Sequence, residues 1–312
     1  MGILIEIIMP VFGLVILGYL AARMGWFEES GIKGLSSFVF NFAIPVMLFR
    51  TLATTALPQE MPWRFLGSYY LSGIALFVAA MLLGRTVFHQ QVKSAGIFAM
   101  AGAYSNVVLL GIPLILTTFG NAASLPLFMI VATQAAVMFF ATTVVVESAG
   151  GHVSRLRHLP WQTIVVLARN PIIVGLLLGL VFNLLELAIP SPIDAVAKSL
   201  GGAALPCAVF SVGASLSQYR VKGSLPEALS LVALKNVVHP VLVWIMADRI
   251  FHLDAVWTAT AVLLAGTPVG VNVYLFAQRY GALIAPAAAA VVLSTGTSIV
   301  TLSVILYLLD VR

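Results

Sequence analysis

The apolar runs of this chain constrain its fold more than any other feature. Stretches of about 20 residues carry almost no charge and follow one another along nearly the whole sequence. A helix needs about 20 residues to cross a bilayer, whereas a membrane β-barrel would show ~10-residue segments of alternating polarity. Of the 312 residues, 61% are apolar and 9% charged, and the mean hydropathy is +1.07. This pattern predicts an all-α polytopic membrane protein and excludes a soluble enzyme, a nucleic-acid-binding protein and a disordered chain.

Short links separate the apolar runs and define the expected membrane spans. The longest link, between Glu147 and Gln162, lies at the midpoint of the chain. The first run lacks the basic residues that precede a secretory signal peptide, so we interpret it as a span. We predict ten spans, at residues 3–22, 35–53, 65–84, 95–118, 123–146, 163–185, 194–217, 227–249, 255–277 and 283–309.

The lysine and arginine residues of the links predict the orientation, because cytoplasmic loops carry the excess of positive charge. With the N-terminus outside, the cytoplasmic links hold ten of them: Arg23, Lys33, Arg85, Lys93, Arg155, Arg157, Arg169, Arg220, Lys222 and Arg279. The outer links hold five: Arg50, Arg64, Lys198, Arg249 and Arg312. We therefore expect a multi-pass protein of the cell inner (plasma) membrane with both termini outside.

The chain also matches itself after a shift of 161 residues, with no gap. The matched pairs are Pro10 and Pro171, Gly18 and Gly179, Pro45 and Pro206, Phe49 and Phe210, and Phe119-Gly120 and Tyr280-Gly281. We expect a first five-helix repeat at 1–150, a cytoplasmic loop at 151–162 and a second repeat at 163–312. An odd number of spans per repeat inverts the second copy in the bilayer, which is typical of secondary transporters.

Two segments rich in Gly, Pro and Asn interrupt the fourth and ninth spans at equivalent places in the two repeats. They are Ser105–Pro113 and Gly266–Asn272. In secondary transporters the substrate site lies where helices are broken near the midplane, and a free helix N-terminus attracts an anion. We therefore count Gly111, Pro113 and Pro268 among the substrate-binding positions. The alternative is that these segments are merely kinked helices.

Four motifs, in this order along the chain, resemble those of the auxin efflux carrier family. They are Phe42-Ala43-Ile44-Pro45-x3-Phe49, Asn106-x4-Gly111-Ile112-Pro113-Leu114, Lys235-x4-Pro240, and Pro268-x-Gly270-Val271-x2-Tyr274-x-Phe276-Ala277-x2-Tyr280. Members of this family export auxin in plants, and bacterial relatives are described as malate or malonate permeases.

The resemblance implies a ten-helix fold of two inverted five-helix repeats, with broken helices 4 and 9 crossing, similar to bile-acid sodium symporters. Helices 1, 2, 6 and 7 would form a scaffold that pairs into a homodimer. Helices 3–5 and 8–10 would form a transport domain that moves like an elevator. Ser105 and Leu48 stand where the plant exporters have Pro and Ser, and the central link is short. These departures argue against auxin as the substrate and favour a bacterial type.

Amide and hydroxyl side chains are the expected contacts of a substrate carboxylate. The resemblance places a ligand-contacting amide at Asn106 and a second one at Gln134. Asn272 follows Pro268 by one helical turn. Tyr274 comes two residues after Asn272, and its hydroxyl is expected to line the same pocket. For each of them the alternative is packing or a hydrogen bond between helices.

Lys235 is a basic residue well inside a span, where an uncompensated charge is costly. We expect it to act as a fixed positive charge that replaces a coupling cation. The alternative is a lysine held by carbonyl groups at a helix C-terminus, or one that reaches the interface. His239, one turn later, is either a proton site or a polar packing residue. We interpret Arg50 as an anchor rather than an anion-attracting group.

These features together favour a secondary carrier of a small organic anion, such as malate, malonate or an auxin-like acid, coupled to protons, to sodium or to neither. A sodium symporter resembling the bile-acid carriers is the alternative. A cation/proton antiporter would need an Asp or Glu in spans four, five or nine, and these spans carry none before Glu147. The histidines form no metal-binding pattern, so we expect no enzyme activity and no cofactor. A membrane sensor without transport is the remaining alternative.

Overall fold

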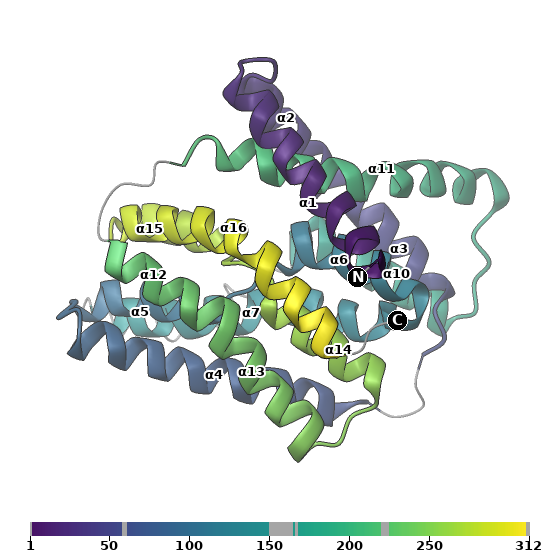
Figure 1. Ribbon diagram of the computed structural model, residues 1–312. Coiled ribbons are helices and arrows are strands. Elements are labelled where there is room, and N and C mark those ends of the chain that lie inside the picture. The colour runs from purple at the N-terminus through teal and green to yellow at the C-terminus, as the bar shows by residue number, and fades with distance from the viewer. Residues whose placement is uncertain (1, 58–60, 150–164, 166–167, 220–224, 310–312) are drawn as a thin grey trace. The chain divides into compact units, whose positions relative to one another are not determined.

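The computed structural model describes residues 2–57, 61–149, 165, 168–219 and 225–309. Within them the chain folds into helices joined by short links (Figure 1). Six helical segments of this part are long and apolar enough to cross a membrane: Glu29–Thr54, Trp63–Thr86, Val107–Ala149, Ser191–Leu216, Leu225–Ile250 and Ile284–Leu308. Shorter apolar helices lie at Ile7–Arg23, Val92–Ala103, Pro171–Leu184 and Ala255–Gly266. The prediction of an all-α membrane protein is thereby confirmed.

The chain forms two compact units, and each draws on both halves of the sequence. The first comprises Met1–Met61, Val108–Ala132 and Ile164–Gln218. The second comprises Pro62–Val107, Thr133–Thr163 and Tyr219–Arg312. The units therefore cut across the division at 1–150 and 163–312, because helices from distant parts of the chain complete each core.

Small residues allow close helix packing in the first unit. Its elements are α1 (Gly2–Arg23), α2 (Glu29–Phe38), η1 (Val39–Ala43), α3 (Ile44–Thr54), α6 (Ile112–Phe119), η3 (Gly120–Ala123), α10 (Pro171–Leu184) and α11 (Ser191–Leu216). A Cβ atom at Gly213 of α11 would collide with the Val15 carbonyl of α1, and one at Gly175 of α10 with the Pro45 carbonyl of α3. Glycine at these positions lets the backbones approach, as is common between membrane helices.

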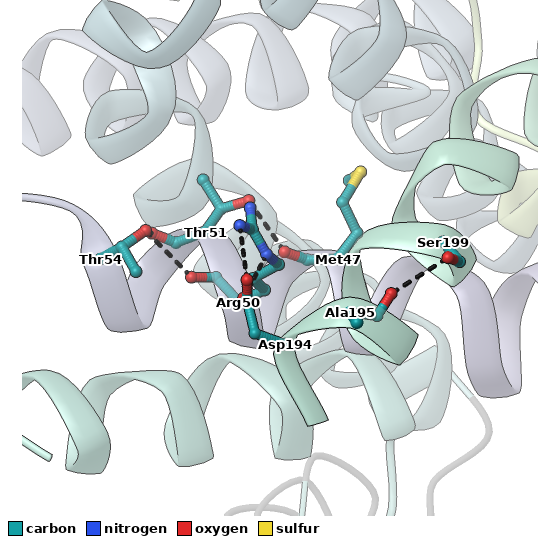
Figure 2. A network of polar contacts seen from close by, with 7 residues as sticks. All are labelled: Met47, Arg50, Thr51, Thr54, Asp194, Ala195 and Ser199. Atoms are coloured by element: carbon teal, nitrogen blue, oxygen red, sulfur yellow. Dashed lines mark hydrogen bonds and ion pairs between the residues drawn. The ribbon is translucent and has the colours of Figure 1, made fainter. Parts of the chain in front are cut away.

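An ion pair joins α3 to the start of α11 within the same unit (Figure 2). The Arg50 guanidinium donates to both Asp194 carboxylate oxygens, with distances of 2.7 and 3.2 Å from Nε and Nη2. Both side chains are about one third exposed. The Arg50 guanidinium is therefore bound by a carboxylate of the same unit and is not a free cation.

The second unit is built around two helices with fully buried faces, α5 (Val92–Ala103) and α14 (Ala255–Gly266). Helix α4 (Trp63–Thr86) lies beside α5, and α12 (Leu225–Ala233) lies beside α16 (Ile284–Leu308) (Figure 1). The other elements are α7 (Ser124–Ala149, from Thr133 on), η4 (Leu234–Val238), α13 (His239–Trp244), η5 (Ile245–Ile250) and α15 (Asn272–Tyr280).

Prolines inside the apolar runs coincide with local widening of the helix. The π-helical segments η1, η2 (Val107–Gly111) and η4 each end two residues before a proline, namely Pro45, Pro113 and Pro240. Proline has no N–H for the usual helical hydrogen bond and clashes with the preceding turn. A wider turn accommodates this defect without ending the helix, and such turns are frequent at functional sites.

Candidate functional site

Two helices of the second unit stop where the sequence predicts interruptions. Helix α5 ends at Ala103, Tyr104 is extended, and helical structure resumes at Val107. Helix α14 ends at Gly266, Thr267 is extended, and α15 begins at Asn272. We call residues 104–106 and 267–271 the paired segments, because they bond to each other.

The backbones of the paired segments form a single antiparallel bridge between Ser105 and Val269. The Asn106 N–H donates to the Pro268 carbonyl (2.9 Å), and the Gly270 N–H donates to the Tyr104 carbonyl (3.0 Å). Unwound backbone inside an apolar environment needs such partners, since lipid offers none. The paired segments therefore form an ordered, polar centre within the unit.

Asn106 and Asn272 differ in how their amides are engaged. Asn106 is 7% exposed, and within the described residues no hydrogen bond reaches its side-chain amide. The Asn272 side chain is half-buried and donates to the Tyr104 hydroxyl. The residue is nearly buried, but its amide atoms are not fully enclosed, so Asn106 is the group best placed to accept a ligand.

Gln134, by contrast, braces the paired segments. Its side-chain oxygen accepts from the Tyr69 hydroxyl (2.7 Å), and its nitrogen donates to the Ser105 carbonyl (2.8 Å). The Tyr69 hydroxyl also lies 3.2 Å from the Ser105 hydroxyl oxygen. Gln134 is fully buried. With both ends of the amide engaged, its visible role is to hold Ser105 in the bridge.

Lys235 is fully buried and reaches the C-terminal end of α14. Its ammonium nitrogen donates to the Ala265 carbonyl and lies 3.3 Å from His239 Nδ1. Helix C-termini carry partial negative charge and favour a cation there. The hydrogen bonding is thus that of a lysine held by a helix C-terminus. Its acceptor, Ala265, lies two residues before the paired segment at 267–271.

The remaining predicted positions fall in different places. Pro268 supplies the carbonyl that Asn106 binds. The Tyr274 hydroxyl accepts from Gln278, and its ring packs edge-on against Tyr219, with centroids 4.8 Å apart.

Gly111 ends η2 and Pro113 lies in α6, and both belong to the first unit. The second unit therefore brings together Asn106, Gln134, Pro268 and Asn272, with Lys235 nearby.

Besides Tyr69, two residues at the paired segments were not anticipated from the sequence, Tyr104 within them and Ser294 beside them. Tyr104 stacks on Phe139, with ring centroids 5.5 Å apart and an angle of 28°. A Cβ atom on Gly270 would lie 2.5 Å from the Tyr104 ring carbons. Ser294 of α16 accepts the Val269 N–H over 3.0 Å. The available signal was a tyrosine directly before the predicted break and a short polar run, Ser294–Ser298, within an apolar span.

Comparisons with known proteins agree with the multi-pass helical structure. The sequence profile described as "Membrane transport protein" matches residues 3–306. A protein of Rhizobium meliloti named "Putative malonate transporter" is 28% identical over 303 residues, which cover 97% of this chain and 95% of that protein. The "Uncharacterized transporter YfdV" of Escherichia coli is 20% identical over 288 residues, covering 88% and 87% of the two chains.

A mouse protein named "Lysosomal cholesterol signaling protein" is 24% identical over 315 residues. The match covers 93% of this chain but 36% of the mouse protein. From the profile match along almost its whole length, the chain belongs to the membrane transport protein family, that of the auxin efflux carriers, and is a multi-pass membrane transporter.

Proposed function

We propose that this chain is a secondary carrier of a small organic anion and that the anion binds at the paired segments. The observation that carries the proposal is the Asn106 amide, which lies on a nearly buried residue beside two interrupted helices and has no hydrogen-bond partner within the described residues. An amide N–H donates well to a carboxylate, and the N-terminus of α15 adds favourable dipole potential. Lys235 supplies positive charge at the end of α14.

Malonate is the first substrate to test, with malate and auxin-like acids after it. The support is the Rhizobium meliloti relative, whose printed name refers to malonate and which this chain matches over almost its full length. The amides, helix terminus and lysine provide several weak positive groups rather than an acidic cavity. Such a set suits a carboxylate better than a cation.

The proposed motion assigns different tasks to the two compact units. The first, whose helices touch backbone to backbone at Gly175 and Gly213, would be a rigid scaffold and the homodimer contact. The second, which contains the paired segments, would move with the substrate in an elevator-type cycle of alternating access. Two inverted repeats of five helices would supply the symmetry of this cycle. The basic residues of the links support external termini in the inner membrane.

A ligand-binding measurement on purified protein tests the site. We expect malonate to raise the apparent melting temperature, because a ligand that binds only the folded state stabilises it. Asn106→Ala should abolish the shift, whereas Asn41→Ala, at an exposed asparagine that bonds within its own helix, should preserve it. Unchanged affinity in a folded Asn106→Ala variant would disprove the site.

The same measurement with and without sodium tests the role of Lys235. If the lysine replaces a coupling cation, binding is independent of sodium. A shift that requires sodium would instead favour a symporter resembling the bile-acid carriers. If malonate, malate and auxin-like acids all bind the protein but none is taken up into proteoliposomes, a sensor would be favoured.

A further inference from the structure

Lys235 and His239 form a buried pair of basic side chains, one helical turn apart. Both are 0% exposed, and Lys235 Nζ lies 3.3 Å from His239 Nδ1. Nζ also donates to the Ala265 carbonyl. The other ring nitrogen, His239 Nε2, is buried and has no hydrogen-bond partner among the described residues. The pair is thus incompletely satisfied in the interior of the second unit.

No acidic side chain contacts this pair within the described residues. Helix α14, which packs on α13, contains no titratable residue. Helix α4 presents Tyr69, whose ring centroid lies 5.8 Å from that of His239. In η5, Asp248 and Arg249 pair with each other at an exposed position. The other titratable side chains of the helices that pack on η4 or α13 are exposed or bonded elsewhere: Arg64, Tyr70, Arg85, Lys93, Glu227 and Tyr307.

This environment limits the pair to one positive charge. Two cations this close, without a counter-ion and away from water, repel each other strongly. In the charged state the Lys235 ammonium donates to Ala265 and to Nδ1 of a neutral His239. In the uncharged state Nδ1–H of His239 donates to the Lys235 lone pair. The same packing therefore accommodates the pair with or without one added proton.

The pair is connected to the paired segments on two sides. Ala265 lies two residues before Thr267, where helix α14 has ended. Tyr69, against the His239 ring, bonds to Gln134 and Ser105 through its hydroxyl. A charge on the pair therefore acts on the paired segments through a short path of buried polar groups. An anion bound there would stabilise the charged state, and the charged state would strengthen anion binding.

We propose that Lys235 and His239 together are the proton-binding site of the carrier, which takes up one proton as it binds one organic anion. The proton comes from water, adds to a nitrogen lone pair of the pair and leaves again when the anion dissociates. The inference rests on the proposed anion site. Because binding effects are reciprocal, anion affinity must rise as the pH falls.

Isothermal titration calorimetry of malonate into the purified full-length protein tests this coupling directly. Titrations in buffers of different ionisation enthalpy count the protons taken up per anion bound. We expect uptake to approach one proton at alkaline pH and to vanish at acidic pH. On the alkaline side the Kd should rise by about tenfold per pH unit.

Two variants and a matched control identify the groups involved. Lys235→Gln and His239→Asn should each abolish the proton uptake that accompanies malonate binding, or move its pH range. Both variants must remain folded and monodisperse for this comparison. His89→Asn is the control, because His89 is exposed and its positive φ of 49° is tolerated by Asn. This variant should behave as wild type.

The outcomes separate this inference from the anion site itself. Malonate binding with no proton exchange in any buffer and a pH-independent Kd would overturn the proton site and leave the anion carrier standing. Proton uptake that is unchanged in both folded variants, Lys235→Gln and His239→Asn, would also overturn it. If neither malonate, malate nor an auxin-like acid binds the wild-type protein at any pH, the proposed function fails, and the proton site fails with it.

Discussion

The Asn272 side-chain amide donates a 2.8 Å hydrogen bond to the hydroxyl of Tyr104, which joins the start of α15 to the end of α5. Tyr104 is 5% exposed, and its carbonyl also accepts the Gly270 N–H. One residue therefore holds the second paired segment through both its backbone and its side chain. This contact fixes the direction of the Asn272 amide, one of the side chains that we expect to contact the substrate.

Tyr104→Phe removes only the hydroxyl that orients Asn272. We expect the Kd for malonate to rise by about fivefold to tenfold, the equivalent of about 1–1.4 kcal/mol for a lost hydrogen bond. Tyr307→Phe, at a residue that is 73% exposed, is the control. In an Asn272→Ala background the Tyr104 substitution should have no further effect. An equal loss in that background would show that Tyr104 acts by another route.

Gly270→Ala tests whether the paired segments must touch. The new methyl group would lie 2.5 Å from the Tyr104 ring and 3.2 Å from the Ser105 carbonyl oxygen. We expect a destabilisation of roughly 1–3 kcal/mol by overpacking, measured as a lower melting temperature, together with loss of malonate uptake in proteoliposomes. Gly296→Ala in α16, where nothing lies within 4 Å, should leave both unchanged. Normal uptake by the Gly270 variant would contradict the assignment.

Ser294→Ala removes the acceptor of the Val269 N–H. A buried donor left without a partner costs about 1–3 kcal/mol, so both the melting temperature and malonate affinity should fall. Ser298→Ala is a matched control on the same helix. Ser298 is equally buried, but within the described part of the chain its hydroxyl bonds only to the Thr295 carbonyl one turn earlier. If the two variants lose the same stability, the bond to Val269 has no special role.

Gly213→Ala tests the close packing of the first unit. Its methyl group would collide with the Val15 carbonyl, and the two helices would have to separate. We expect the variant to be less stable by roughly 1–3 kcal/mol, measured by thermal unfolding in detergent. Gly202→Ala, in the same helix but facing open space, should be neutral or slightly stabilising, since Ala favours the helix. Similar melting temperatures for both variants would show that α1 and α11 can adjust.

Part of the candidate site could be predicted from local sequence. The interruptions at 104–106 and 267–271 coincide with the clusters of Gly, Pro and Asn from which we expected them. Gly111 and Pro113 came from the same argument, yet they lie in η2 and α6 of the first unit. Proline widens or breaks a helix through its own backbone, so the defect is local. Whether a defect binds substrate depends on what faces it.

The partners of the polar side chains could not be predicted in this way. The amide of Gln134 resembles that of Asn106 in sequence terms, but the first is bonded at both ends and the second is unpartnered. The Tyr69 hydroxyl on α4 and the Ser105 carbonyl of the first paired segment make the difference, and both lie outside the helix that carries Gln134.

The sequence alone determined the membrane class, the helical structure and the positions where two helices stop, because hydrophobic length and proline geometry act over a few residues. Only the tertiary structure decided that Ser105 pairs with Val269, that Lys235 donates to Ala265 and that Gln134 bonds to Tyr69. These contacts join residues far apart in sequence, and close packing of whole helix surfaces selects them rather than any local preference.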